Sequence, residues 1–154
     1  MRPDIRTYAD TSVFGGVFDE EFRLPSRRFF QQVKTGNFAL VTSVIVQNEL
    51  EEAPDNVAKY FNEMLEFAEM AELSEKALAL RRAYLQAKVV TNKYADDALH
   101  VALATVAGCD LIVSWNFKHI VHFQKIPLYN AINTIQGYAH IAIYSPSEVI
   151  KYEK

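Results

Sequence analysis

The chain has 154 residues, of which 50% are hydrophobic and 23% charged, a composition typical of a compact folded protein and not of a disordered or fibrous one. Its formal net charge of -3 argues against a protein that coats nucleic acid, although a metal site built from carboxylates would itself contribute negative charge. The single cysteine excludes an internal disulfide, and no apolar run reaches the roughly 18 residues of a membrane span, so we expect a cytoplasmic protein. We also expect residues 1–154 to form one domain.

The hydrophobic pattern predicts short strands that alternate with helices. Strands are expected over residues 5–9, 38–41, 69–73, 111–113 and 141–144, and the third of these fits a continuation of the preceding helix almost as well. Helices are expected to begin near Pro25, Val44, Asp55, Ser74 and Asp97, with a further helix and a terminal turn around the last strand.

Several residues are expected to mark the ends of these elements. Capping side chains are expected at Thr42 or Ser43, at Asp55 and at Ser74. Glycine stops are expected at Gly36 and Gly108. After the first strand, Asp10, Thr-Ser and the Gly15-Gly16 pair predict a polar turn, and the helix from Val44 is expected to run to Glu52 before Pro54.

This alternation predicts an α/β protein with a three-layer α/β/α architecture, in which helices cover both faces of a central, mainly parallel sheet. The crossovers that parallel strands require are almost always right-handed. The alanine-rich segment after Asp97 is apolar on most sides, so it should pack closely against the sheet. Sheets of this kind bind ligands at the carboxyl ends of their strands, where we expect the functional site.

Four polar residues are expected near that edge of the sheet. Asp10 and Asn116 follow two predicted strands, Asp97 begins a helix, and Glu49 lies within the helix that follows another strand. Helical side chains lean toward the N-terminus of their helix, so the long Glu49 side chain can reach back toward the strand ends. Carboxylate and amide oxygens in one crevice suit Mg²⁺ or Mn²⁺, which indicates a metal-dependent phosphoryl-transfer site.

Each of these residues also has a purely structural interpretation. Asp10 can cap the turn that follows it, Asp97 can complement its helix dipole, and Asn116 can form an Asx turn. Glu49 can be one of several solvated acids on an exposed helix face. The convergence of all four at one edge favours a site, because independent caps have no reason to gather there.

Two segments resemble the PIN-domain nucleases, particularly the small VapC-type toxins of toxin–antitoxin pairs. YADTSVFGG (residues 8–16) is similar to the family's opening strand, and DALHVALATVAGCDLIVSWNF (residues 97–117) is similar to its helix and strand that carry the later acids. The resemblance assigns the family's acids and their polar support to five residues of this chain, namely Asp10, Glu49 and Asp97 with Ser12 and Ser114. The chain departs from the family at Asn116, where a fourth acid is often found.

The resemblance implies a PIN-like fold and Mg²⁺- or Mn²⁺-dependent endoribonuclease activity. Asp10, Glu49 and Asp97 would hold the ion, which lowers the pKa of a bound water so that the water can attack the scissile phosphorus. Asn116 would orient a water or ligate through its amide oxygen, and Ser12 would hydrogen-bond the water or Asp10. The family further implies a toxin with an RNA substrate, a cognate antitoxin and a homodimeric state.

Basic and aromatic side chains follow the last predicted site residues. Trp115, Lys118, His119 and His122 could stack on a base or contact phosphate, although Trp115 can equally be packed and Lys118 solvated. His100, one turn beyond Asp97, can hydrogen-bond a ligating carboxylate or face the core, and we do not include it among the expected site residues.

Two other classes of protein remain as alternatives. A PIN-like module that binds RNA or protein without cleaving would be consistent with Asn116 at the fourth acidic position. A receiver or an aspartate-nucleophile phosphatase fits less well. Such a phosphatase usually carries a second Asp where this chain has Ser12, and a receiver needs an Asp after its middle strand, where this chain has Thr42.

Overall fold

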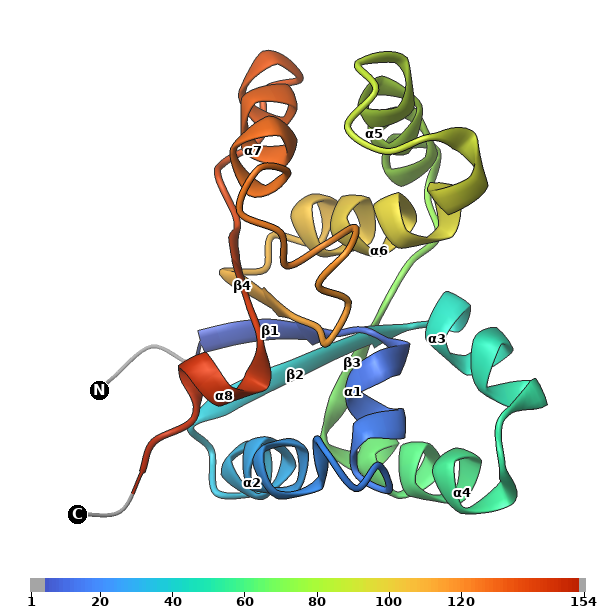
Figure 1. Cartoon of the computed structure of the whole chain (residues 1–154), viewed down its shortest axis with the longest axis vertical. Coiled ribbons are helices and arrows are strands. Elements are labelled where there is room, and N and C mark those ends of the chain that lie inside the picture. Colours follow the sequence, from blue (N-terminus) through green and yellow to red (C-terminus); the bar gives the residue numbers. More distant parts are fainter. Residues whose placement is uncertain (1–4, 153–154) are drawn as a thin grey trace.

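The computed structural model describes residues 5–152 and contains a five-stranded sheet (Figure 1). The strands are β1 (Ile5–Ala9), β2 (Phe38–Ser43), β3 (Ala68–Ala71), β4 (Leu111–Val113) and β5 (Ala142–Tyr144), and they lie in the order β3-β2-β1-β4-β5. Every neighbouring pair is parallel, so the carboxyl ends of all five strands lie at one edge. The predicted α/β class and central sheet are confirmed, and the sheet is wholly parallel.

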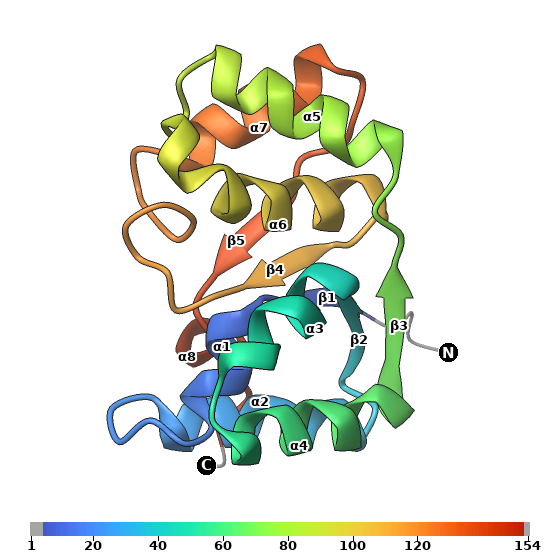
Figure 2. The ribbon, with the colours of Figure 1, turned by 90° about the vertical axis from the view of Figure 1, so that its right-hand side faces the viewer.

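Helices cover both faces of this sheet, as predicted. They are α1 (Thr11–Gly16), α2 (Arg23–Lys34), α3 (Val44–Glu49), α4 (Asp55–Met64), α5 (Glu75–Gln86), α6 (Ala95–Val106), α7 (Ile126–Ile135) and α8 (Pro146–Val149), with 3-10 turns η1 (Leu50–Glu52), η2 (Leu65–Phe67) and η3 (Asn92–Tyr94). Figures 1 and 2 show α6 against one face, with α5 and α7 beyond it, and α1, α2 and α4 against the other face.

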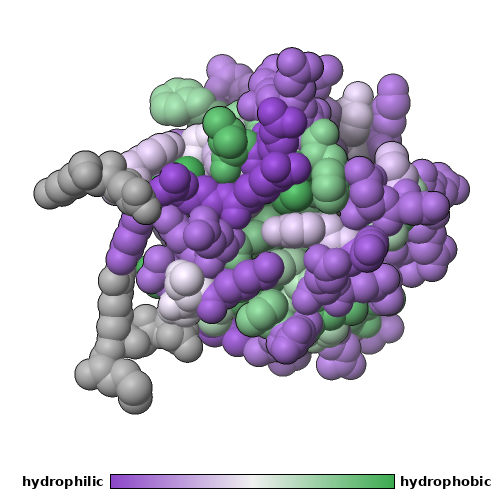
Figure 3. Space-filling model, turned by 90° about the horizontal axis from the view of Figure 1, so that it is seen from below, coloured by the Kyte–Doolittle hydropathy of each residue, from purple (hydrophilic) through white to green (hydrophobic). Residues whose placement is uncertain are grey.

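The core has a different character on the two faces. On one face, α6 is buried along eight consecutive residues, Ala98 to Thr105, because it lies between the sheet and the α5 and α7 pair; its alanines permit this close approach. On the other face, the rings of Phe14, Phe30 and Phe61 pack in tilted and edge-on contacts. The outer side of that layer is mostly hydrophilic with scattered apolar side chains (Figure 3).

Within residues 5–152, no helix has the length and apolar character needed to cross a bilayer.

Several predicted helix signals are confirmed. Ser43 Oγ accepts a hydrogen bond from the Val46 N–H at the start of α3, and Ser74 Oγ accepts one from the Ala77 N–H at the start of α5. Gly36 and Gly108 have positive φ angles of 88° and 73°, the conformation that glycine adopts readily after a helix.

Other expected boundaries were wrong. Asp55 is the first residue of α4 and follows Pro54, which has no side-chain cap bond, so Asp55 is not the capping residue. The helix from Val44 ends at Glu49 and tightens into the 3-10 turn η1, whereas α2 begins at Arg23 and α6 at Ala95, both before the expected start. Sequence patterns locate such ends only to within a few residues.

The segment after Asp10, predicted as a polar turn, is instead the helix α1. Asp10 accepts a hydrogen bond from the Ser12 N–H at 3.1 Å and so caps this helix. Burial of Val13, Phe14 and Gly16 offsets the low helix propensity of the glycine pair.

Gly16 lies where α1 passes closest to Trp115 and α2. A Cβ at position 16 would stand 2.5 Å from Ser26 Oγ and 2.8 Å from Trp115 Nε1, and these two atoms already form a hydrogen bond of 2.8 Å. A Cβ at Gly15, one residue earlier in the same helix, would meet nothing within 4 Å. The two glycines are neighbours in the last turn of α1 but differ in packing.

We expect Gly16→Ala to lower the free energy of unfolding by about 2 kcal/mol, because the added methyl group forces Trp115 and Ser26 apart. Gly15→Ala should change it by less than about 1 kcal/mol, in the stabilising direction. Urea unfolding followed by Trp115 fluorescence measures both variants. Equal unfolding midpoints for the two variants would contradict the role assigned to the close approach at Gly16.

Candidate functional site

The carboxyl ends of β1, β2 and β4 bring polar side chains together at one edge of the sheet. Asp10 follows β1, Ser43 ends β2, and Ser114 follows β4. All three side chains are buried, and α3 and the first turn of α6 lie beside them. This is the edge at which the sequence predicted the site.

Asp10 is a buried carboxylate that the protein surrounds with donors. Its Oδ1 accepts hydrogen bonds from the Ser12 N–H (3.1 Å) and the Ser12 hydroxyl (2.6 Å), and its Oδ2 accepts one from the Ser114 hydroxyl (2.6 Å). The residue is only 4% exposed. Burial raises the pKa of Asp10; the nearby His100 and the two serine hydroxyls offset part of this effect, and the charge of Glu49 adds to it.

Glu49, the last residue of α3, reaches back to the first turn of α1 and to α6. Its Oε1 accepts hydrogen bonds from the Thr11 hydroxyl at 2.5 Å and from His100 Nε2 at 2.7 Å. The side chain is 35% exposed. Partial burial would raise the pKa of Glu49, but the bond to His100, the charge of that imidazole and the Thr11 bond outweigh burial and lower it.

His100 is a residue of this site that the sequence analysis did not include. It lies within α6 and both of its ring nitrogens have partners, with Nε2 on Glu49 and Nδ1 2.8 Å from the Tyr8 hydroxyl. Burial would lower the pKa of His100, but the bond to Glu49 and the charges of Asp10, Glu49 and Asp97 raise it overall. The only signal in the sequence was its position three residues after Asp97, which places both on one face of a helix.

Asp97 lies in the first turn of α6 and is partly exposed. Within residues 5–152 its carboxylate has no hydrogen-bond partner, in contrast to Asp10 and Glu49. Its charge raises the pKa of His100 and opposes the lowering of the pKa of His119 by burial. Both carboxylate oxygens of Asp97 are therefore available to bind a ligand.

Ser12, Ser114 and Asn116 hold the loop after β4 against Asp10. The Ser12 hydroxyl accepts from the Trp115 N–H at 2.8 Å, and the Ser114 hydroxyl accepts from the Asn116 N–H at 2.9 Å. Asn116 Oδ1 accepts from the His119 N–H at 3.0 Å, so its amide oxygen already closes a local turn. The structural interpretation of Asn116 as a turn residue is thus observed.

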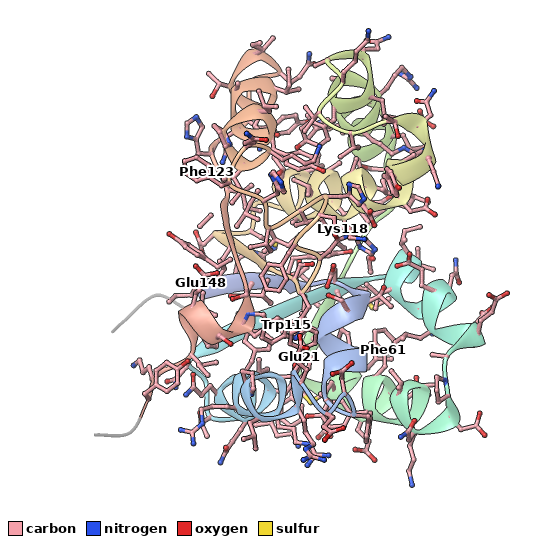
Figure 4. The ribbon with its side chains drawn as sticks, viewed as in Figure 1. Glu21, Phe61, Trp115, Lys118, Phe123 and Glu148 are labelled. Atoms are coloured by element: carbon pink, nitrogen blue, oxygen red, sulfur yellow. The ribbon has the colours of Figure 1, made fainter. Side chains whose placement is uncertain are left out.

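Three of the four residues considered for RNA contact, Trp115, Lys118 and His119, lie in different environments (Trp115 and Lys118 are labelled in Figure 4). Trp115 is 9% exposed, stacks on Phe22 with a centroid distance of 4.2 Å and donates to Ser26, so its ring faces are occupied by the protein. Lys118 is exposed near the site. His119 stacks on Tyr94 with a centroid distance of 3.7 Å.

The donor set can be compared with the requirements of a hard divalent ion. In the part of the chain that the structure describes, no three His, Cys, Asp or Glu side chains are grouped closely enough to hold a metal. The chemistry nevertheless fits Mg²⁺ or Mn²⁺, because Asp10, Glu49 and Asp97 supply carboxylate oxygens, and within residues 5–152 neither Glu49 Oε2 nor the Asp97 carboxylate has a hydrogen-bond donor. The three carboxylates therefore fit such an ion by the type and the charge of their donor atoms.

No family model and no curated protein matches the sequence. Two solved structures share the architecture. One is VapBC2 from Rickettsia felis bound to a DNA fragment from their promoter, with a TM-score of 0.58 and 17% identity over 90% of this chain and 96% of that chain. The other is FitAcB from Neisseria gonorrhoeae, with a TM-score of 0.55 and 13% identity over 93% of this chain and 99% of that chain.

The chain has a PIN-like fold. The resemblance seen in the two sequence segments is thereby confirmed at the level of the fold, over nearly the whole chain. At these identities the likeness concerns the backbone architecture, and chemistry has to be argued from the residues at the edge of the sheet.

The raised pKa of Asp10 predicts a cost in stability at neutral pH. A carboxyl group whose pKa is higher in the folded state favours folding while it is protonated, and this contribution is lost as the pH rises through the folded-state pKa. Asp10→Asn keeps the shape and the acceptor for Ser12, and Ser114 can accept from the new amide. We expect the free energy of unfolding of Asp10→Asn to exceed that of the wild type by about 1 kcal/mol at pH 7.

This advantage should shrink as the pH falls toward the ordinary pKa of an aspartate, and urea unfolding between pH 4 and pH 8 measures it. Asp96→Asn, at an exposed position in the first turn of α6, is the control and should lose at most about 0.5 kcal/mol of helix-dipole stabilisation. An Asp10→Asn protein that is less stable than the wild type at pH 7 would contradict the expected cost of the buried charge.

Proposed function

We propose that this chain is a metal-dependent endoribonuclease that hydrolyses RNA phosphodiester bonds and acts as the toxin of a toxin–antitoxin pair. The observation that carries the proposal is a carboxylate, Asp10, buried at the carboxyl edge of a PIN-like sheet, whose charge acts on the same His100 as the charges of Glu49 and Asp97. A carboxylate buried at such an edge costs free energy, which a purely structural role would not require.

Asp10, Glu49 and Asp97 would hold a Mg²⁺ or Mn²⁺ ion. When bound, such an ion supplies charge neutralisation for the phosphoryl oxygens and acidifies a water molecule. The chain's own residues hold two of these carboxylates in place. Ser12 and Ser114 hold Asp10 through three hydrogen bonds, and Thr11 and His100 hold one oxygen of Glu49.

The charge distribution supports an RNA strand on one side of the site. Residues 81–125 carry six Lys and Arg against three Asp and Glu, whereas residues 44–80 carry two against nine. Glu49 belongs to the acidic stretch and Asp97 to the basic one. We place the phosphate backbone along the basic side, with Lys118 as a phosphate contact and the Tyr94 and His119 pair beside it. Trp115 supports the loop from inside the protein, where it stacks on Phe22 and donates to Ser26, and we assign it no contact with RNA.

An antitoxin partner and a homodimer complete the proposal. The two structural neighbours are toxin–antitoxin complexes, which supports a protein partner for this chain.

A PIN-like module that binds without cleaving is the second candidate. It is favoured by Asn116, whose amide oxygen caps a turn at the position of the family's fourth acid.

Purified protein supplied with Mn²⁺ or Mg²⁺ should cleave a structured RNA mixture, and a chelator should abolish the cleavage. Asp97→Asn should lower the cleavage rate by about a hundredfold or more, because it removes a charged ion ligand, whereas the adjacent exposed Asp96→Asn should leave the rate within a few-fold of the wild type. Cleavage products resolved on a sequencing gel give the rates and the cut sites.

Circular dichroism has to show that all three proteins are folded. Equal losses in Asp96→Asn and Asp97→Asn would remove Asp97 from the site. No cleavage of any RNA by folded wild-type protein with metal would favour the binding module.

Lys118→Ala should weaken RNA binding by a similar factor for every RNA sequence and reduce the slope of log affinity against log salt by about one, because one phosphate contact is lost. The measurement uses fluorescence anisotropy of a labelled RNA in the Asp97→Asn background, which prevents cleavage. Lys76→Ala, in the acidic stretch at the start of α5, is the matched control and should leave the slope unchanged. An unchanged slope in Lys118→Ala would place the RNA elsewhere.

A further inference from the structure

His100 is a buried, fully hydrogen-bonded histidine that neither the sequence motifs nor the proposed metal ligands explain. Its side chain is 4% exposed, so it cannot itself touch a strand of RNA. Nε2 lies 2.7 Å from Glu49 Oε1, and Nδ1 lies 2.8 Å from the Tyr8 hydroxyl. Both nitrogens are therefore satisfied in the core, as burial requires, and one of the two partners is the Glu49 carboxylate.

The hydrogen bonds of His100 continue to the other end of α3. The Tyr8 hydroxyl lies 2.8 Å from Ser43 Oγ as well as from His100, and Ser43 Oγ accepts the Val46 N–H that begins α3. Glu49 is the last residue of the same helix. One continuous chain of hydrogen bonds therefore joins the first turn of α3 to the carboxylate at its end.

Glu49 needs these hydrogen bonds because α3 alone does little to fix the position of its side chain. The helix α3 has six residues, which is too short to be stable by itself, and Val46 is its only buried residue. A free glutamate side chain also has many rotamers, and fixing one of them costs conformational entropy. The Thr11 hydroxyl and His100 Nε2 both donate to Oε1, so Glu49 is held by one oxygen while Oε2 has no donor within residues 5–152.

We propose that His100 is the positioning residue for Glu49, and that the Tyr8 hydroxyl fixes the imidazole ring in the orientation that presents Nε2 to the carboxylate. A half-turn of the ring would replace both nitrogen contacts by carbon contacts. The Tyr8 hydroxyl can donate or accept, so it holds Nδ1 in either protonation state of the histidine. The consequence for catalysis rests on the proposed function, in which Glu49 is an ion ligand.

Two neutral substitutions separate positioning from charge and from packing. Gln can place its amide N–H₂ near the position of Nε2 and so keep a donor for Glu49. Asn reaches only the position of Nδ1, so it can keep the Tyr8 contact but not the Glu49 contact. Both His100→Gln and His100→Asn remove the imidazole charge and part of the ring volume, and they differ mainly in the donor to Glu49.

The first readout is the side-chain order parameter of Glu49 from NMR relaxation in the metal-free protein, and the second is the affinity for Mn²⁺ measured by electron paramagnetic resonance of the free ion. His100→Asn should lower the order parameter and weaken Mn²⁺ binding about 10- to 100-fold relative to His100→Gln, which should stay within a few-fold of the wild type. In a Glu49→Gln background, His100→Asn should cause no further loss of Mn²⁺ affinity.

Tyr8→Phe provides a second test that leaves the imidazole and its volume in place. Loss of the hydroxyl should lower the order parameter of Glu49, because the ring is no longer fixed. This variant keeps the proposal testable if His100→Asn does not fold, as judged by circular dichroism and thermal melting.

Equal Glu49 order parameters in His100→Asn and His100→Gln, or an unchanged order parameter in folded Tyr8→Phe, would overturn the positioning role whatever the protein does to RNA. Failure of the proposed function gives a different result. In that case the order parameter still falls in His100→Asn, which supports positioning, while the wild type neither binds Mn²⁺ nor cleaves RNA.

Discussion

A carboxylate buried at the end of the central strand constrains everything around it. Asp10 can stay ionised there only if donors replace the water that it has lost, and those donors come from Ser12 in α1 and Ser114 in the loop after β4. The same serines accept the N–H groups of Trp115 and Asn116, so the loop conformation and the carboxylate environment are set together. The site is accordingly a property of the β1 and β4 pairing and not of a mobile surface loop.

Asp10 and Glu49 are held by different chemistry. Neutral hydroxyls surround Asp10 and leave its pKa raised by burial, whereas Glu49 meets an imidazole and a hydroxyl and has its pKa lowered despite partial burial. Asp97 has the fewest constraints of the three. For an ion bound among them, Asp10 would be a ligand fixed in the core and Glu49 a ligand bonded to α6. Asp97 would be a ligand that can still adjust its position.

The order of strands and helices could be predicted because apolar periodicity and glycine stops are local signals, and the position of Asp10, Glu49 and Asp97 near one edge followed from the parallel topology. The sequence could not reveal that Asp10 caps a helix, because two glycines argue against one until the burial of Phe14 is known. The sequence could not decide between RNA contact and packing for Trp115 for a related reason. Its indole is engaged by Phe22 and Ser26, which are far away in sequence. The sequence also left both roles of His100 open, because helical periodicity cannot distinguish an apolar neighbour from a hydrogen-bonded one.

The pairing of Asp10 with Ser114 also has a consequence for when the site is completed during synthesis. These two residues are 104 positions apart, and Glu49 and His100 are 51 apart, so the contacts that hold both carboxylates are non-local. Contacts of this kind close after local helices have formed. During synthesis, the first half of the chain can form β1, β2 and α3, but Asp10 has no Ser114 until β4 has left the ribosome. A truncated or still-growing chain therefore lacks the contacts that hold Asp10 and Glu49 in place.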